Sequence, residues 1–163
     1  MRIGLATDHG GYPFKEAVIL NLMHQGHEVI DFGAEYLQPT DDYPDFVAPL
    51  ARAVASGAVE RGLALCGSGV GACITANKIP GVRACLIHEN YTAHQAVEHD
   101  NLNVLCLGAR VIGIESALEL ITTFVNAQFT GEERHVRRLG KIVKIEQEEV
   151  KSSSSKSTNI LFS

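Results

Sequence analysis

The chain has 163 residues, of which 45% are apolar and 20% are charged, and this length is enough to bury one hydrophobic core. With 14 Lys and Arg against 19 Asp and Glu, its net charge of −5 disfavours nucleic acid as a partner. No apolar run approaches the roughly 20 residues of a membrane span, and the first residues lack the build of a signal peptide, so we expect a cytoplasmic protein without a membrane partner.

The first elements alternate between an apolar strand and a helix. Residues 2–7 form a short apolar run, and a helix is predicted from residue 12 to residue 24, with Pro13 in its first turn. A strand at residues 27–33 and a helix at residues 44–56 come next. Strands followed by helices of this length indicate that consecutive strands run parallel.

The same alternation continues through the rest of the chain. The predicted elements are, in order, strand 62–66, helix 71–79, strand 82–87, helix 90–98, strand 103–108, and helices 114–129 and 132–149. Strands that are apolar on both faces are typical of a parallel sheet covered on both sides. We therefore predict a Rossmann-like α/β fold, a three-layer α/β/α sandwich with a five-stranded parallel sheet and C-terminal helices. This single domain covers residues 1–149, and the Ser-rich segment 150–163 is expected to be a disordered tail.

Unusual residues follow three of the predicted strands. Asp8 and His9 open the sequence DHGG after the first strand, the sequence CGSGVG occupies residues 66–71 after the third, and Arg110 follows the fifth. In open parallel α/β sheets, ligands bind beyond the carboxyl ends of the strands. We expect these segments to converge on one edge of the sheet.

The segment CGSGVG is the most specific of these. Glycines at positions 67, 69 and 71 allow backbone amides to turn toward a bound anion, such as a phosphate or an enediolate. The segment is neither a Walker loop nor the dinucleotide fingerprint GxGxxG. A thiol beside such amides and a helix N-terminus loses its proton more readily. Cys66 can therefore be a general base, or it can be a core cysteine that ends an apolar strand.

The other three cysteines lie in or beside apolar segments and show no CxxC spacing. We predict that they are reduced core thiols, and a disulfide framework or a zinc site is disfavoured. These residues are Cys73, Cys85 and Cys106.

Histidines in two of the segments suit proton transfer but have simpler explanations. Histidine side chains in general change charge near neutral pH, and the neighbouring Asp8 can orient His9. A DH pair also occurs as a helix N-cap with an exposed histidine. His99 lies at the predicted end of the fourth helix, where a histidine is commonly a favourable contact with the helix dipole.

Two further segments suit a phosphorylated ligand. Arg134 and Arg138 lie one turn apart on the last predicted helix. Two guanidinium groups so placed can bind a phosphate together, or they can form a solvated basic face. Asp41, Asp42 and Tyr43 precede a proline that starts a helix, and most such segments are caps and turns.

Taken together, these motifs resemble the ribose-5-phosphate isomerase type B family. The resemblance runs from residue 2 to residue 149 and rests on seven motifs in order. They are DHGG at 8–11, DYP at 42–44, CGSGVG at 66–71, ANK at 76–78, His99 with Asn103, GxR ending at Arg110, and RHxxR at 134–138.

The resemblance implies an aldose–ketose isomerase of the pentose phosphate pathway that needs no metal or cofactor. By this likeness Cys66 moves a proton through a cis-enediolate and Ser68 passes a proton between the two oxygens. Backbone amides would stabilise the enediolate. His99, with Asp8 nearby, would open the furanose ring. The amides belong to Gly67, Gly69, Val70 and Gly71.

The same resemblance implies how the sugar phosphate is bound. Tyr43 would line the sugar pocket, and Asp100 lies where many relatives have an asparagine that contacts the substrate oxygens. The protein would be a homodimer or a dimer of dimers in which each active site uses two subunits. The phosphate ligands would be His9, Arg110, Arg134 and Arg138, some of them from the partner.

The chain resembles one branch of the family and departs from it at one position. Another branch uses a glutamate base just after the glycine loop, where this chain has Ala72, so Cys66 indicates the cysteine-type branch. At Asp100 a carboxylate would repel an enediolate unless it is protonated or turned away. Either Asn101 substitutes for the usual asparagine, or the substrate preference differs.

Several alternatives remain open on these grounds. An isomerase of allose 6-phosphate, galactose 6-phosphate or erythrulose 4-phosphate would share much of the site. A noncatalytic phosphosugar sensor would keep the anion-binding groups but would not need Cys66, Ser68 and His99 together. A redox-sensing thiol protein would respond to oxidation of Cys66 without turnover.

Overall fold

The computed structural model describes residues 1–159, and of residues 153–159 the backbone alone. The strands are β1 (Arg2–Thr7), β2 (Glu28–Asp31), β3 (Arg61–Cys66), β4 (Ala84–Leu86) and β5 (Val104–Gly108). The helices are α1 (Tyr12–His24), α2 (Tyr43–Ala55), α3 (Val70–Ala76), α4 (Asn90–Asp100), α5 (Ile114–Asn126) and α6 (Glu133–Asn159).

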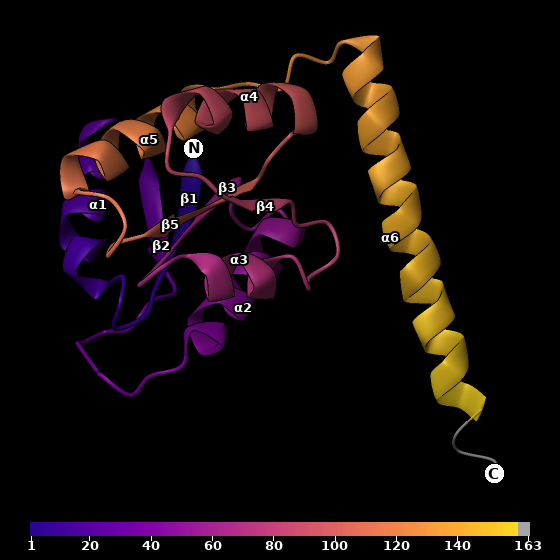
Figure 1. Ribbon diagram of the computed structural model, residues 1–163, viewed down its shortest axis with the longest axis horizontal. Coiled ribbons are helices and arrows are strands. Elements are labelled where there is room, and N and C mark those ends of the chain that lie inside the picture. Colours follow the sequence, from indigo (N-terminus) through magenta and orange to yellow (C-terminus); the bar gives the residue numbers. More distant parts are fainter. Residues whose placement is uncertain (160–163) are drawn as a thin grey trace. The chain divides into compact units, whose positions relative to one another are not determined.

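The five strands form one parallel sheet in the order β2-β1-β3-β5-β4, so β3 lies at its centre (Figure 1). Helices α1, α4 and α5 pack on one face, and α2 and α3 pack on the other. This arrangement confirms the predicted α/β/α sandwich with its five-stranded parallel sheet. Because successive strands run parallel, all their carboxyl ends lie at the same edge.

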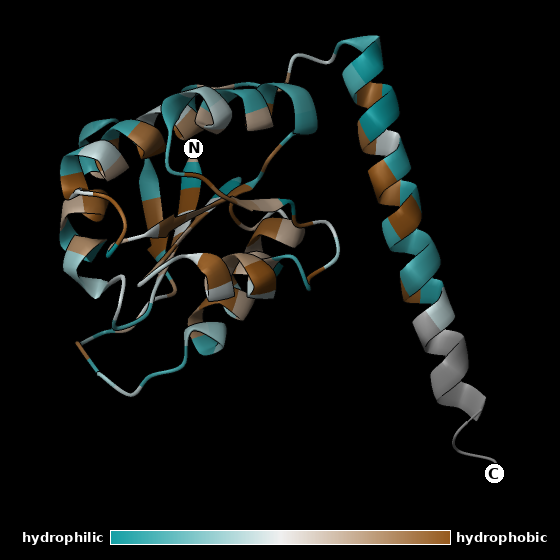
Figure 2. Ribbon diagram, in the orientation of Figure 1, coloured by the Kyte–Doolittle hydropathy of each residue, from teal (hydrophilic) through white to brown (hydrophobic). Residues whose placement is uncertain are grey.

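Alternating side chains of the strands enter the two cores. On β1, Ile3 and Leu5 face the helices α1, α4 and α5, whereas Ala6 faces α2 and α3. Figure 2 shows the apolar residues gathered on the strands and on the helix faces that meet them. Both faces are thus covered by apolar side chains, which explains why the strands read as continuous apolar runs.

The contacts within the chain define two compact units, Met1–Phe129 and Thr130–Ser163, and each is described by itself. This division falls before the predicted boundary at residue 149.

None of the helices in the described residues combines the length and the apolar character that crossing a bilayer requires.

The last helix is longer than the sequence pattern predicts. The expected end was residue 149, followed by a disordered tail, but α6 continues to Asn159. Its backbone can do so because residues 141–159 contain neither glycine nor proline, the residues that most readily end a helix. Residues 160–163 of the predicted tail lie outside the described residues.

Candidate active site

The loop between β1 and α1 is built around Asp8. Its backbone oxygen accepts hydrogen bonds from Gly11 N, at 3.1 Å, and from Tyr12 N, at 2.8 Å. One carboxylate oxygen, Oδ1, also accepts from Gly11 N at 2.9 Å, and the side chain is buried. Asp8 therefore holds the turn that leads into α1, which is close to the simpler capping role.

The loop between β3 and α3 presents the predicted base. Cys66 is the last residue of β3 and is only 5% exposed. Its sulfur accepts a hydrogen bond from Gly69 N at 2.9 Å. Gly69 has a φ of 81°, and a side chain there would collide with Leu86 and with the backbone of Leu107. Only glycine fits this turn, and the turn brings a backbone N–H directly onto the thiol.

The two loops contact each other at the carboxyl edge of the sheet. A Cβ on Gly10 would lie 2.5 Å from Gly67 N, so the backbone of one loop packs directly on the other. Arg110 lies over the same glycine loop, because a Cβ on Gly67 would be 3.5 Å from its guanidinium carbon. Its backbone N also donates to Gly67 O at 3.0 Å. The structure thus brings the three predicted segments together.

Tyr43 approaches the glycine loop from α2. Its ring packs so closely on Gly71 that a Cβ there would lie 2.5 Å from the ring carbon Cζ. Tyr43 is partly exposed, as is Val70 at the start of α3, and Ser68 is also exposed on the loop. An aromatic side chain, a hydroxyl and a guanidinium group therefore surround the Cys66 loop.

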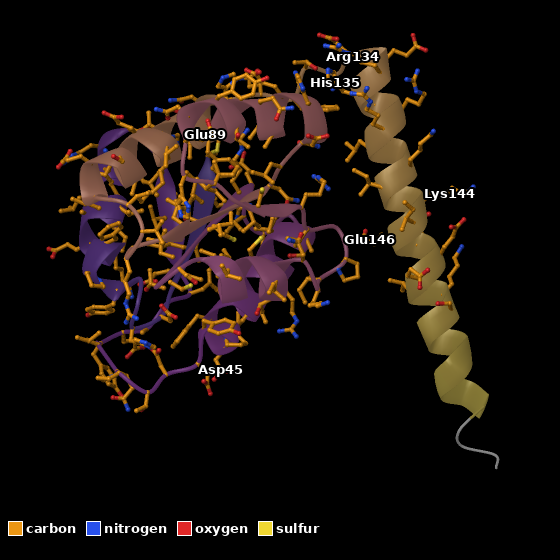
Figure 3. All side chains as sticks on the ribbon, in the orientation of Figure 1. Asp45, Glu89, Arg134, His135, Lys144 and Glu146 are labelled. Carbon is orange, nitrogen blue, oxygen red and sulfur yellow. The ribbon has the colours of Figure 1, made fainter. Side chains whose placement is uncertain are left out.

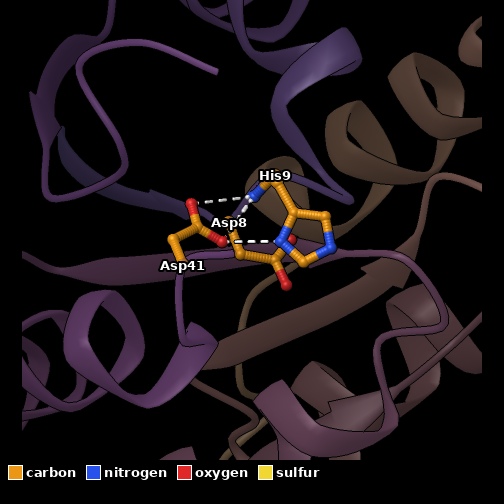
Figure 4. A group of neighbouring side chains, drawn as sticks. All are labelled: Asp8, His9 and Asp41. Carbon is orange, nitrogen blue, oxygen red and sulfur yellow. Dashed lines mark hydrogen bonds and ion pairs between the residues drawn. The ribbon is translucent and has the colours of Figure 1, made fainter. Parts of the chain in front are cut away.

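The carboxylate that orients His9 is Asp41, and the expectation that Asp8 would do so is wrong (Figure 4). The His9 ring nitrogen Nδ1 lies 2.6 Å from Asp41 Oδ1. His9 N donates to both oxygens of the same carboxylate, at 3.0 and 3.1 Å. The carboxylate of Asp8 instead accepts from Gly11. The chain reversal after β2 brings Asp41 back to the β1 loop, which no local pattern indicates.

Ligand atoms of Asp8, His9 and Asp41 lie within 4.8 Å of one another. A divalent cation could be held by such a group. The carboxylates are already bonded to protein hydrogens, however, since Asp41 accepts from His9 and Asp8 accepts from Gly11. These bonds give the group a structural explanation without a metal.

His99 and Asp100 do not join Cys66 within one chain. They end α4, which returns from the carboxyl edge of β4 to the amino end of β5 (Figure 1). Asn103, at this amino edge, accepts from Gly62 N near the start of β3. Cys66 lies at the other end of that strand, roughly 13 Å away along its length. Within a single chain His99 and Asp8 therefore lie at opposite edges of the sheet, and the expected site shared between two subunits stays a prediction.

The contacts described for His99, and the helix end that follows Asp100, lie within α4 and its cap. His99 Nδ1 lies 2.7 Å from Gln95 Nε2, one turn earlier on α4. Asp100 is exposed, and Asn101 closes the helix in a left-handed conformation with a φ of 52°. Asparagine tolerates this conformation better than most residues, so Asn101 has a structural role as the helix C-cap.

The predicted phosphate-binding arginines of the last helix belong to the second unit. Arg134 lies in the first turn of α6 beside His135 (Figure 3). Its Nε donates to Glu132 at 2.9 Å and to His135 at 3.0 Å. Arg138 is exposed one turn later. The two guanidinium groups therefore belong to successive turns of α6.

Cys73 and Cys106 lie in the core under α2 and α3, and Cys85 packs against the core under α1, α4 and α5. These three thiols differ from one another, whereas the sequence pattern predicts plain core cysteines. A hydrogen bond with Cys106 is the main reason that the pKa of Cys73 falls to about 7. Contacts with the Leu86 backbone and the Asn77 amide lower it further, and burial opposes the shift. The hydrogen bond with Cys73, followed by burial, raises the pKa of Cys106 well above its usual range, and burial raises the pKa of Cys85.

This difference predicts an order of alkylation. At pH 7, iodoacetamide should modify Cys73 before Cys85, although both are partly exposed, because the thiolate is the reactive form. The rate at Cys73 should level off above about pH 8, whereas the rate at Cys85 should keep rising. Peptide mapping by mass spectrometry measures both sites, with Cys73→Ser as the control. Faster labelling of Cys85 at pH 7 would contradict the hydrogen-bond arrangement.

Comparisons with known proteins agree with this architecture. A family model described as ribose/galactose isomerase matches residues 3–142. The chain belongs to the ribose/galactose isomerase family. It is 42% identical over 146 residues to a probable ribose-5-phosphate isomerase B of Mycoplasma pneumoniae, covering 90% of this chain and 95% of that protein.

Solved structures of family members match over nearly their whole length. Ribose-5-phosphate isomerase B of Clostridium thermocellum is 44% identical, with a TM-score of 0.87, covering 91% of this chain and 99% of that one. The enzyme of Mycoplasma genitalium, solved with bound ribulose 5-phosphate, is 38% identical with a TM-score of 0.86. That match covers 90% of this chain and 97% of the other. These likenesses make this chain a member of an isomerase family with the expected fold.

Proposed function

We propose that the protein interconverts ribose 5-phosphate and ribulose 5-phosphate through a cis-enediolate. The observation that carries this proposal is the Cys66 thiol at the carboxyl edge of the sheet, with Gly69 N donating to it and Arg110 over the adjoining loop. Ribulose 5-phosphate bound to the relative from Mycoplasma genitalium supports the choice of sugar. The reaction has a place in the pentose phosphate pathway.

In the proposed reaction Cys66 acts as a thiolate general base. It removes the proton from the carbon next to the carbonyl group and returns it to the neighbouring carbon. The enediolate that forms between these steps carries negative charge on oxygen. Amides of residues 67–71 would stabilise that charge, at about 3 kcal/mol per well-placed donor. The exposed hydroxyl of Ser68 would pass a proton between the two oxygens.

The phosphate would be bound by cationic and hydrogen-bonding side chains around this edge. His9 lies on the loop whose Gly10 packs on Gly67, and the side chain of Arg110, from the loop after β5, also lies beside Gly67. Tyr43, packed on Gly71, would line the sugar pocket. Arg134 and Arg138 would complete the phosphate site, since two guanidinium groups one turn apart suit a dianion.

We propose that a second copy of the chain supplies His99. The supporting observation is that His99 and Cys66 lie at opposite edges of the sheet within one chain. Exposed apolar side chains are available to bury in a homodimer or a dimer of dimers, both at the edge that carries Cys66 and along α6. They are Val70, Ile74 and Val111 in the first unit and Val136, Ile142, Ile145 and Val150 in the second.

Asp100 would enter the partner's site together with His99, because the two are neighbours at the end of α4. A carboxylate there is unusual beside an enediolate, and Asn101 is already engaged as the helix C-cap.

The four free thiols are typical of a protein in a reducing compartment, and they support a cytoplasmic location.

The test is turnover of ribose 5-phosphate by the purified protein with a chelator present. Product formation with a kcat/KM at least tenfold above that for allose 6-phosphate, galactose 6-phosphate and erythrulose 4-phosphate would support the proposal. A preference for one of those sugars would move the proposal to that substrate. Absence of turnover with all four, together with measurable binding, would favour a noncatalytic phosphosugar sensor.

A further inference from the structure

Asp41 holds His9 through both its backbone and its ring. The carboxylate accepts from His9 N with both oxygens, at 3.0 and 3.1 Å, and its Oδ1 lies 2.6 Å from ring atom Nδ1. The side chain of Asp41 is only 8% exposed, whereas that of His9 is 31% exposed. A nearly buried acceptor thus fixes the base of a side chain whose far end reaches solvent.

These bonds determine which atom of the ring can meet a ligand. A carboxylate accepts hydrogen bonds, so the Nδ1 atom carries the hydrogen that Asp41 receives. Nε2 is then the nitrogen that remains for a ligand, and Figure 4 shows it turned away from Asp41. Gly10, the residue after His9, packs on Gly67, so the loop that carries this ring contacts the glycine loop that begins at Cys66.

We propose that Asp41 is a positioning residue that fixes the orientation and tautomer of His9 for the phosphate group of the substrate. This inference rests on the proposed function of the site. Asp41 does not touch the substrate in this arrangement, and it acts through His9 alone. In the comparable case of metal-bound histidines, removing the carboxylate that orients the ring typically lowers affinity or activity by about 10-fold to 100-fold.

The first experiment compares Asp41→Ala with Asp45→Ala, a matched acidic residue that is exposed in the first turn of α2 (Figure 3). Asp41→Ala should raise the KM for ribose 5-phosphate and the inhibition constant of inorganic phosphate about tenfold, with kcat within about twofold. Asp45→Ala should change neither. Asp41→Asn keeps the Oδ1 atom that both His9 hydrogens share and should recover most of the affinity.

A double-mutant cycle separates positioning from a general structural effect. In a His9→Ala background, Asp41→Ala should alter KM by less than about twofold, because its partner is already absent. A tenfold increase in that background would overturn the proposal. Thermal unfolding of each variant identifies loss of folded protein, and the tautomer of His9 in the unaltered protein remains the test if Asp41→Ala does not fold.

The tautomer can be measured without activity, so failure of the proposed reaction would leave this inference testable. Long-range proton–nitrogen NMR should find the hydrogen of His9 on Nδ1 in the unaltered protein and in Asp45→Ala. In Asp41→Ala it should move mainly to Nε2. A His9 ring with its hydrogen on Nε2 in the unaltered protein would overturn the proposal, whatever the protein isomerises.

Discussion

Replacing Cys66 by alanine is expected to lower kcat for ribose 5-phosphate by about 10³-fold, which corresponds to about 4 kcal/mol of lost transition-state stabilisation. KM should stay within about threefold, because the groups proposed to bind the phosphate remain. Cys66→Ser should fail similarly, since a hydroxyl is a far weaker acid than a thiol. Turnover in deuterated water gives a second measurement, because loss of the base also abolishes incorporation of solvent deuterium into the sugar.

The matched control is Cys85→Ala, which removes a partly buried thiol from β4 instead of β3. It should keep its kcat within about twofold, because it creates only a small cavity away from the glycine loop. Unfolding midpoints should be recorded for each variant. If folded Cys66→Ala protein keeps more than a tenth of the original kcat, Cys66 is not the base, whichever sugar the enzyme prefers.

Mixing two inactive variants should restore activity if each site uses two chains. Cys66→Ala and His99→Asn homodimers each carry one defect at every site. In a mixed dimer both defects fall on the same site, and the other site is intact. Coexpression or joint refolding in equal amounts should therefore restore about a quarter of the original kcat per chain, because half of the dimers are mixed and half of their sites are intact.

Two controls make this result interpretable. Mixing without exchange of subunits should restore nothing at early times, and a chain that carries both substitutions should contribute no activity when combined with either single variant. Sedimentation should find a dimer or a larger even assembly. A monomer that turns over substrate, or a mixture that stays below a hundredth of the original activity, would contradict the shared site and leave His99 outside the reaction.

Much of the arrangement at the carboxyl edge of the sheet, where these experiments are directed, could be predicted from the sequence. Apolar runs separated by helix-length segments predict a parallel sheet, because each strand must be buried on both faces and each connection must return to the same starting edge. That rule alone predicts that the loops beginning at Asp8 and Cys66 lie at the same edge, and the strand order of the structure makes them neighbours. The glycines at 67, 69 and 71 also predict a tight loop, and Gly69 indeed adopts a backbone conformation that other residues disfavour.

Tertiary structure alone decided how the polar groups pair. Asp41 and His9 are 32 positions apart, and only the return of the chain after β2 brings them together, so the sequence favoured the adjacent Asp8. Cys73 differs from Cys85 because its sulfur forms a hydrogen bond with Cys106 in the core under α2 and α3. Hydrophobic periodicity specifies which faces are buried, but hydrogen-bond partners depend on angstrom-scale approach between segments. For the same reason, only the direction of α4 revealed that His99 ends at the edge of the sheet opposite Cys66.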